Sequence, residues 1–495
     1  MKLIYGVSDK PTIGKTLVFA FQQMIAIMAA TLLVPLLMSG FATGVPGETL
    51  SFDPAAALFG AGCGSIVYIL FTKRRSPVFL GSSFTFLGAY AAVIGHNYGY
   101  WGVLIGIAFA GLVYVVIAII IKLVGSNWIN KLMPAVIIGP IVAIIGLSLS
   151  GTATGWMSGN GGAAANWYTE LIYIAIGLIT FLVIAWASTK GTKGMKLIPF
   201  IIGIGAGYLV ALILSIIGWS ADVEALKIID FNLFKNWANN FGFTSILDYP
   251  KFTFLKAIEL GDAATQHIDG AAIGNIALTF IPIGIVELAQ HIADHKNLSS
   301  IIEKDLITDP GLDKTLLGDG VGSIVGGFFG GAANTTYGES IGCVAITKNA
   351  SIYSILFAAI GCIVLSFFTP FVLLINSIPK CVMGGACIAM YGFIAVSGLQ
   401  MLKQVDLSDS RNLYVVASIL VVGIGGLTLN FGNHEGSPII TFTSLATALF
   451  VGLITNLLVH KIPSLDKEGE QEKVEDAPSA SEAQIADENH EEDEE

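Results

Sequence analysis

The chain has 495 residues, of which 54% are hydrophobic and only 12% are charged. No soluble domain of this length needs so much apolar material, so the composition excludes an ordinary soluble enzyme or binding module. A hydrocarbon core about 30 Å thick takes roughly 20 apolar residues per helical crossing, and the sequence contains many such runs. We therefore expect an all-α polytopic membrane protein in the cell membrane, in contact with lipid.

The formal net charge of −11 comes from the C-terminal segment alone. Residues 461–495 hold 14 Asp and Glu against 3 Lys, whereas the remaining 22 acidic and 22 basic residues cancel. A strongly acidic stretch with almost no large apolar residues cannot bury a core. The sequence therefore predicts a disordered tail. At the other end, the first fifteen residues lack the apolar region of a cleavable signal, so the first apolar run should remain as a span.

No constellation typical of an enzyme or a cofactor site occurs in the sequence. The five cysteines lie singly inside apolar runs, without the spacing of metal ligands. There is no GxxxxGK[ST] phosphate loop, HExxH motif, paired CxxC or GxSxG nucleophile elbow. We expect no enzyme activity, no cofactor, no metal and no nucleic-acid partner.

Fourteen apolar spans can be marked, in two sets of seven separated by the polar segment 219–269. The first set is approximately 14–38, 54–72, 78–95, 100–122, 132–150, 167–188 and 196–218. The second set is approximately 270–292, 316–332, 335–348, 352–376, 379–398, 411–430 and 438–460.

The basic residues test this topology. With 14 spans and a cytoplasmic N-terminus, 20 of the 25 Lys and Arg residues fall in cytoplasmic segments and five fall outside. Cytoplasmic segments of membrane proteins carry such an excess of Lys and Arg. The sequence therefore predicts that both termini are cytoplasmic and that segment 219–269 is extracellular.

An odd number of spans in each half places the second half in the opposite orientation, so any internal repeat must be inverted. Inverted repeats are common in secondary transporters, whose sites lie near the midplane where interrupted segments meet. The third span of each half fits this pattern, since VFLGSSFTFLG (78–88) and NTTYGESIG (334–342) are both short and polar. Broken helices there would offer backbone N–H groups to a ligand. The alternative is that their glycines and serines only allow close helix packing.

The stretch 334–349 carries the strongest functional signal. Glu339 is a carboxylate at bilayer depth, where ionisable groups are costly and face a bundle interior or an aqueous cavity. Irregular backbone at that depth is tolerated only where it lines such a cavity. We expect Glu339 to line a site for a small molecule; a pairing with a neighbouring helix is the alternative.

The polar residues of the eighth span share one helical face. Gln290, His291, Asp294 and His295 follow Glu287 by 3, 4, 7 and 8 positions. We expect a cavity or a polar partner on this face. Glu287 and Gln290 should lie deepest, whereas Asp294 and His295 lie near the cytoplasmic end of the span, where water can reach them.

The motif ESIG at 339–342, followed by Thr347 and Lys348, resembles the signature of the nucleobase–ascorbate transporter family. The longer run NTTYGE at 334–339 is similar to the uracil-permease branch of that family. Similar motifs extend from span one to span thirteen: GSSF at 81–84, KDL at 304–306, DPGL at 309–312, and MGG at 383–385 with Tyr391.

This resemblance implies a seven-plus-seven inverted repeat of 14 transmembrane spans, with short extended segments in spans 3 and 10. A core domain would move against a gate domain, and the family often forms homodimers through the gate domain. The implied segments are a cytoplasmic N-terminus at 1–13, core domain at 14–124 and 270–376, gate domain at 125–218 and 377–460, an extracellular inter-repeat loop at 219–269, and the cytoplasmic tail at 461–495.

The same resemblance implies where a base would bind. The backbone at Phe84 and Gly338 and the Glu339 carboxylate should contact it, and Tyr391 should approach through water. Tyr337 and Phe84 are candidates to cover the faces of the ring.

Three positions depart from the family pattern. Gln290 stands where the family usually has Glu, and it cannot carry a proton. Asp294 stands where uracil carriers often have His and purine carriers commonly have Asp. In span one, Gln22-Gln23 replaces a Gln-His pair.

These departures leave the substrate and the coupling group open. We expect a secondary active nucleobase permease that takes up uracil, with Glu339 and either Asp294 or Glu287 exchanging the coupled proton. Sodium coupling is the rival. The alternatives in substrate are a xanthine or uric acid permease of the same family and an anion transporter of the related sulfate or bicarbonate type.

Overall fold

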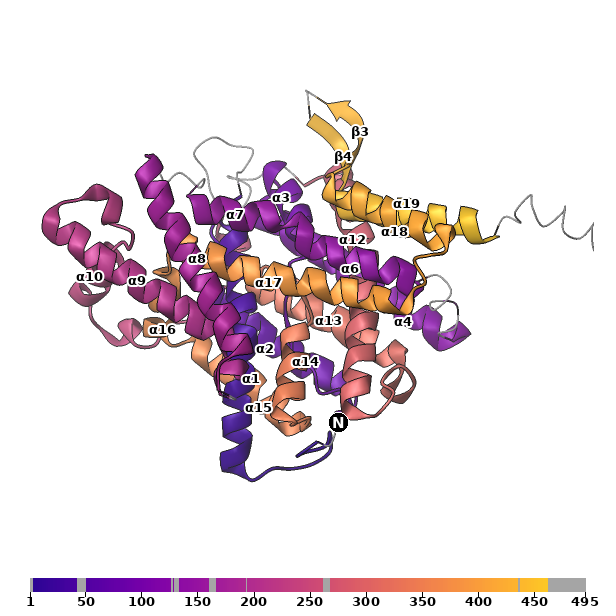
Figure 1. Cartoon of the computed structure of the whole chain (residues 1–495), viewed down its shortest axis with the longest axis horizontal. Helices are drawn as coiled ribbons and strands as arrows, with labels where there is room; N and C mark the ends of the chain where they lie inside the picture. The colour runs from indigo at the N-terminus through magenta and orange to yellow at the C-terminus, as the bar shows by residue number, and fades with distance from the viewer. Residues whose placement is uncertain are drawn as a thin grey trace, which may run out of the picture.

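The computed structural model describes residues 3–41, 50–125, 128, 133–159, 166–192, 194–260, 268–434 and 437–461. The predicted disordered tail beyond residue 461 lies outside the described residues, as does part of the inter-repeat segment. Most of the described chain is helical (Figure 1).

Eight helical segments in the described chain are long and apolar enough to cross a membrane, which makes this a polytopic integral membrane protein. They are α1 (Ile13–Met38), α2 (Pro54–Phe71), α4 (Gly99–Val124), α6 with α7 (Ala135–Ser148 and Ser150–Ser158), α8 (Trp167–Thr189), α9 (Pro199–Ala221), α12 (Gly270–Ile302) and α17 (Lys380–Met401). Shorter apolar helices are α15 (Ile352–Ser366), α18 (Ser410–Ile424) and α19 (Ser444–Lys461).

Other helices and single turns connect these elements. They are α3 (Leu87–Gly95), α10 (Asn232–Asn239), α11 (Thr253–Leu260), α13 (Leu312–Gly330), α14 (Gly338–Thr347) and α16 (Thr369–Asn376), with short turns at Met195–Leu197, Glu224–Leu226, Phe243–Ser245, Ile307–Gly311 and Leu402–Gln404.

The helices pack in two groups. In the first, α2 packs on α13 and α15, α4 packs on α12 and α13, and α1 packs on α15. In the second, α17 packs on α6, α7 and α8, while α8 contacts α9 and α18 contacts both α6 and α19. Figure 1 shows α6 and α17 side by side, with α18 and α19 at one end and α8 to α10 at the other. The groups meet where α12 passes α6 and α19.

Glycines allow a backbone-to-backbone contact between α2 and α13. A Cβ added at Gly60 would lie 2.3 Å from the backbone oxygen of Gly326, and one at Gly64 would lie 2.7 Å from that of Gly322. Small residues let membrane helices approach backbone to backbone, where packing replaces the missing hydrophobic driving force. The α2–α13 contact therefore tolerates no larger side chain at these positions.

Two short strands cross at the centre of the first group, so the expected extended segments in spans 3 and 10 are present. Strands β1 (Leu80–Ser82) and β2 (Asn334–Thr336) pair antiparallel, with Gly81 opposite Thr335. Their free edges are satisfied by hydroxyls of the flanking helices. Ser65 of α2 bonds the backbone of Leu80, and Ser323 of α13 donates to the backbone oxygen of Asn334. Irregular backbone at bilayer depth requires such partners.

The C-terminal part of the chain differs from the sequence prediction. The apolar run assigned to 411–430 is helical only to Ile424, and residues Leu429–His434 (β3) pair antiparallel with Ser437–Phe442 (β4). This hairpin projects from the place where α18 ends and α19 begins (Figure 1). Residues 429–430 and 438–442 were thus wrongly assigned to helical spans, because a short apolar run can belong to a strand as well as to a helix.

Two further boundaries are corrected. The helix assigned to 270–292 continues to Ile302, so His295 lies inside α12 and only 1% of it is exposed, instead of being near a wet helix end. The segment assigned to 352–376 is two helices, α15 and α16, separated at Phe367 and Phe368. Segment 219–269 contains the short helices α10 and α11 rather than loop alone.

Candidate functional site

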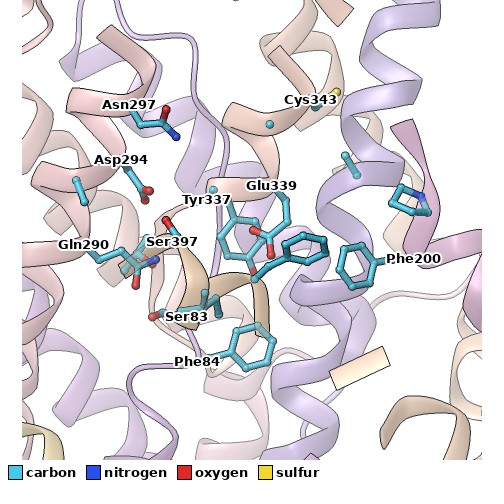
Figure 2. A pocket seen from close by; sticks show the side chains of 18 of the residues that line it. Ser83, Phe84, Phe200, Gln290, Asp294, Asn297, Tyr337, Glu339, Cys343 and Ser397 are labelled. Atoms are coloured by element: carbon cyan, nitrogen blue, oxygen red, sulfur yellow. The ribbon is translucent and has the colours of Figure 1, made fainter. Parts of the chain in front are cut away.

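A cavity of about 570 Å³ lies between the two helix groups (Figure 2). One wall comes from α1, α12 and the two strand-to-helix junctions, and the other comes from α6, α9 and α17. Its lining includes Ser83, Phe84, Thr335, Tyr337, Gly338, Glu339, Gln290, Asp294 and Asn297 on the first wall, and Val142, Lys196, Phe200, Phe393 and Ser397 on the second. Six of the eight residues predicted from the sequence therefore meet in one place.

Glu339 stands in the first turn of α14, directly after strand β2. Figure 2 shows its carboxylate between the Gln290 and Asp294 side of the cavity and Phe200 on the opposite wall. The alternative, in which Glu339 pairs with a helix in a closed seam, does not fit this placement, because the residue is half-buried and lines the cavity. The first backbone N–H groups of α14 lie beside it and have no partner within the helix.

Gly338 leaves the beginning of α14 open to the cavity. A Cβ added at Gly338 would meet no atom within 4 Å, and the same holds at Gly342 one turn later. A ligand can therefore approach the backbone here more closely than a side chain would allow.

Tyr337 ties the two broken segments together. Its hydroxyl donates to the backbone oxygen of Ser82 at 2.6 Å, and its ring lies against Gly81, where an added Cβ would come within 2.4 Å of the ring. Only 4% of Tyr337 is exposed, so one edge of the ring contributes to the cavity while its polar end is already paired.

Phe84 and Tyr391 contact each other across the boundary of the helix groups. Their rings meet edge to face with centroids 5.4 Å apart. Phe84 lines the cavity, whereas Tyr391 is buried behind it and does not. The predicted approach of Tyr391 to a ligand through water thus lacks a direct path in this conformation.

The polar residues of α12 divide into two stripes. Gln290, Asp294 and Asn297 face the cavity, and Asp294 accepts a hydrogen bond from the Thr336 hydroxyl at 2.9 Å. Glu287 does not line the cavity. It is 1% exposed and faces the hydroxyls of residues in the two broken segments, namely Ser83, Thr85 and Thr335.

Ser340 and Gln23 were not singled out by the sequence as a contact. Gln23 of α1 donates to the Ser340 hydroxyl, and the backbone N–H of Phe79 donates to the same oxygen at 3.0 Å. These bonds fix the first turn of α14 against α1 and the segment before β1. The signal for this role was the presence of an amide in an otherwise apolar span.

Lys196 was also missed. It is half-buried and lies on the second wall, and it is the single basic residue among the described residues that line the cavity. Its position at the end of an apolar span predicts only a cytoplasmic charge.

The fold resembles that of solved membrane transport proteins. The transmembrane domain of a cyanobacterium bicarbonate transporter, BicA, covers 90% of this chain and 98% of its own with a TM-score of 0.53 at 15% identity. The structure of SLC26A9 gives a TM-score of 0.58 at 10% identity, over 90% of this chain and 65% of that one. At these identities the likeness concerns the fold alone.

Sequence relatives place the chain more narrowly. The model of the permease family Xan_ur_permease matches residues 14–431, and this chain belongs to that family, in agreement with the resemblance seen in its motifs. It is 34% identical to the uracil permease of Bacillus caldolyticus over 92% of this chain and 95% of that protein. Identity to the uracil permease of Escherichia coli K12 is 30%, over 91% and 95%. These relatives are named permeases, that is, transporters and not enzymes.

Proposed function

We propose that this protein is a secondary active nucleobase permease that takes up uracil together with a proton. The observation that carries the proposal is the Glu339 carboxylate, set at the start of α14 in a cavity between two helix groups. The similarity of the chain to named uracil permeases, over nine-tenths of its length, supports uracil as the substrate.

The cavity chemistry suits a planar heterocycle with alternating N–H and C=O groups. An ionised Glu339 accepts hydrogen bonds from ring N–H groups, and Gln290 supplies one acceptor and two donors. The open backbone at Gly338 can donate to a ring carbonyl. Phe84 and Tyr337 offer apolar ring faces. Each polar group of the ring must find a hydrogen-bond partner, because an unpaired buried group costs about 1–3 kcal/mol.

The proposed mechanism is alternating access of a core domain (14–124 and 270–376) against a gate domain (125–218 and 377–460). The two observed packing groups follow this division, and the cavity lies between them. The proposal includes 14 spans in an inverted repeat. In its support, Ser65 after Gly60 and Gly64 in α2, and Ser323 near Gly322 and Gly326 in α13, make matching contacts to the two strands. Cytoplasmic termini and homodimers through the gate domain complete the proposal.

The coupling proton is proposed to exchange at Glu339 and Asp294, which share the cavity. Glu287 is a less direct participant, since it reaches the cavity only through hydroxyls of the broken segments. Two carboxylates in one small site disfavour ionising together, so a proton is retained when no cation is bound.

Uptake into liposomes tests the proposal. Purified protein should accumulate radiolabelled uracil when an inward proton gradient is imposed, with sodium replaced by choline. Glu339→Gln should lose this accumulation, whereas Glu259→Gln, the same change at an exposed position on α11, should keep it. Full pH-driven accumulation by Glu339→Gln would refute the role, and dependence on sodium would identify the rival coupling ion.

A purine substrate is the second candidate, and Gln290 with Asp294 favours it, because the family resemblance links Asp at the latter position to purine carriers. Competition by unlabelled xanthine and uric acid, set against uracil, separates the two. Sulfate belongs in the same assay, since the fold is shared with an anion transporter. Two carboxylates in the cavity argue against an anionic substrate.

A further inference from the structure

A second polar cluster lies behind strand β2 and outside the cavity. His291 of α12 and Asp319 of α13 place Nδ1 2.6 Å from Oδ2, and both side chains are completely buried. The other ring nitrogen of His291, Nε2, lies 3.1 Å from the hydroxyl oxygen of Thr315. Neither member of the pair lines the cavity, so the contacts proposed above for the base make no use of it.

The pair has two protonation states in which both ring nitrogens of His291 are hydrogen-bonded. With His291 charged, Nδ1–H donates to Asp319 and Nε2–H donates to Thr315, whose hydroxyl donates to the backbone oxygen of Leu312 at 3.2 Å. With His291 neutral, Nδ1–H still donates to Asp319, and the Thr315 hydroxyl turns to donate to Nε2. The states differ by one proton on Nε2, and neither leaves that nitrogen unpaired.

Charge decides between the two states. The charged imidazole and the carboxylate together are neutral, whereas the neutral imidazole leaves one uncompensated negative charge. A lone charge in a dry interior is far costlier than a hydrogen-bonded pair. In a dry interior the pair is therefore more stable with the extra proton than without it.

Among the described residues, His291 is the only cationic partner of Asp319. The titratable side chains around the pair are Glu287, Asp294 and His295 on α12, Tyr68 on α2 and Tyr114 on α4. His295 stacks on His291 with centroids 4.1 Å apart, so a second charged imidazole would be repelled. Its Nδ1–H donates to the backbone oxygen of His291 and its Nε2 faces the Tyr68 hydroxyl at 2.7 Å.

Thr336 connects the pair to the cavity. Its backbone N–H faces Asp319, while its hydroxyl donates to Asp294, which lines the cavity. The two carboxylates thus lie on either side of one strand residue and within electrostatic reach of each other. A change of charge at Asp294 therefore changes the free energy of the proton held behind the strand.

We propose that the His291–Asp319 pair holds a co-transported proton, with the Thr315 hydroxyl as its switch. The inference rests on the proposed proton-coupled uptake and adds a proton-holding group outside the base-binding cavity. A proton from water binds Nε2 on one side of the membrane. After the domains move, it passes from Nε2 to water on the other side, and the Thr315 hydroxyl takes its place. Because Gln290 cannot hold a proton, this pair gives coupling a carrier that leaves the contacts to the base unchanged.

Asp319→Asn tests the pair, since the amide keeps the shape but not the charge that stabilises the imidazolium. In liposomes, pH-driven uracil accumulation should fall by about tenfold or more, because losing one partner of a buried pair is costly. Uracil-induced proton entry, followed with an internal pH dye, should be lost. Counterflow of labelled uracil against a uracil-loaded interior, which needs no net proton movement, should continue.

Thr315→Val and Thr315→Ser decide the case if Asp319→Asn does not fold. Valine removes the switch and serine keeps the hydroxyl, so the valine variant alone should lose pH-driven accumulation. Equal pH-driven accumulation by the two Thr315 variants, or its survival in Asp319→Asn with proton entry intact, would overturn the inference. Failure of the unmodified protein to accumulate uracil with a pH gradient would instead refute the proposed function, and this outcome is distinct.

Discussion

The two broken segments look alike in sequence but contribute different chemistry to the cavity. The segment through β1 supplies Ser83 and Phe84 and carries no ionisable group, whereas the segment through β2 supplies Glu339 at a helix start. Each strand is held by a serine from the adjacent helix. The comparison shows that two segments with similar backbone structure can have different roles. The β1 segment shapes the cavity through Phe84, and the β2 segment provides a charge through Glu339.

The largest effect is expected from filling the gap between the segments. Gly81→Ala would drive a methyl group into the Tyr337 ring and break the hydrogen bond of Tyr337 to Ser82. Overpacking of this kind costs about 1–3 kcal/mol. Thermal unfolding in detergent should show a lower midpoint and weaker uracil binding. Gly88→Ala, where the new Cβ makes only an ordinary contact at 3.7 Å, is the control. Equal stability of the two variants would contradict the expected clash.

Ser340→Ala should have an effect of similar size, because it leaves two buried donors without an acceptor. The Gln23 side chain and the backbone N–H of Phe79 both point at the lost hydroxyl. Each unpaired buried donor costs about 1–3 kcal/mol. We expect reduced stability and a less fixed α14, measured as lower thermal midpoint and reduced uptake. Ser220→Ala, at an exposed position in α9, should behave as the unmodified protein does. An unchanged midpoint for Ser340→Ala would show that α14 does not depend on this bond.

Gly338→Ala sharpens the comparison at the site itself. The methyl group has open space, so the fold should be unaffected, but it would occupy the place where a base approaches the backbone. A loss of about 1.4 kcal/mol would lower affinity about tenfold. Equilibrium binding of uracil measures this, with Gly205→Ala, at an open and exposed position of α9 outside the cavity lining, as the control. Equal affinities would place the base elsewhere in the cavity.

Phe84→Leu should have the smallest effect. It keeps an apolar side chain on the β1 segment and removes the edge-to-face contact with Tyr391. Such aromatic pairs contribute about 0.5–1.5 kcal/mol beyond their buried area. A modest rise in the concentration for half-maximal uptake is expected, with proton coupling retained. Loss of coupling in Phe84→Leu would show that the β1 segment does more than shape the cavity.

The broken segments and Glu339 could be predicted from the sequence, because polar residues inside short apolar runs must face a protein interior or an aqueous cavity. The same argument applies to Asp319, a lone acid between glycines in an apolar stretch, whose role was missed. Its partner on α12 had been assigned to a single polar face. Helical periodicity gave that face correctly, yet it cannot tell which part meets a cavity and which meets another polar helix.

The β3–β4 hairpin and the end of α12 could not be read from hydropathy. Residues 429–430 and 438–442 include Leu429, Ile439, Ile440 and Phe442, so hydropathy placed them at the ends of two apolar spans, although they pair as strands. In α12, the polar residues after His295 resemble a helix end in water, but the helix continues to Ile302. Tertiary contacts decide both cases, and no local pattern records them.

The 33 residues of α12 have a mechanical consequence. At 1.5 Å per residue the helix is about 50 Å long, well beyond the roughly 30 Å of hydrocarbon that it traverses. One uninterrupted rod therefore carries Gln290 and Asp294 on one side, His291 on another, and its last turns out toward the aqueous phase. A displacement of that protruding end would therefore move the cavity residues and His291 of the buried pair together, because all of them belong to one continuous helix.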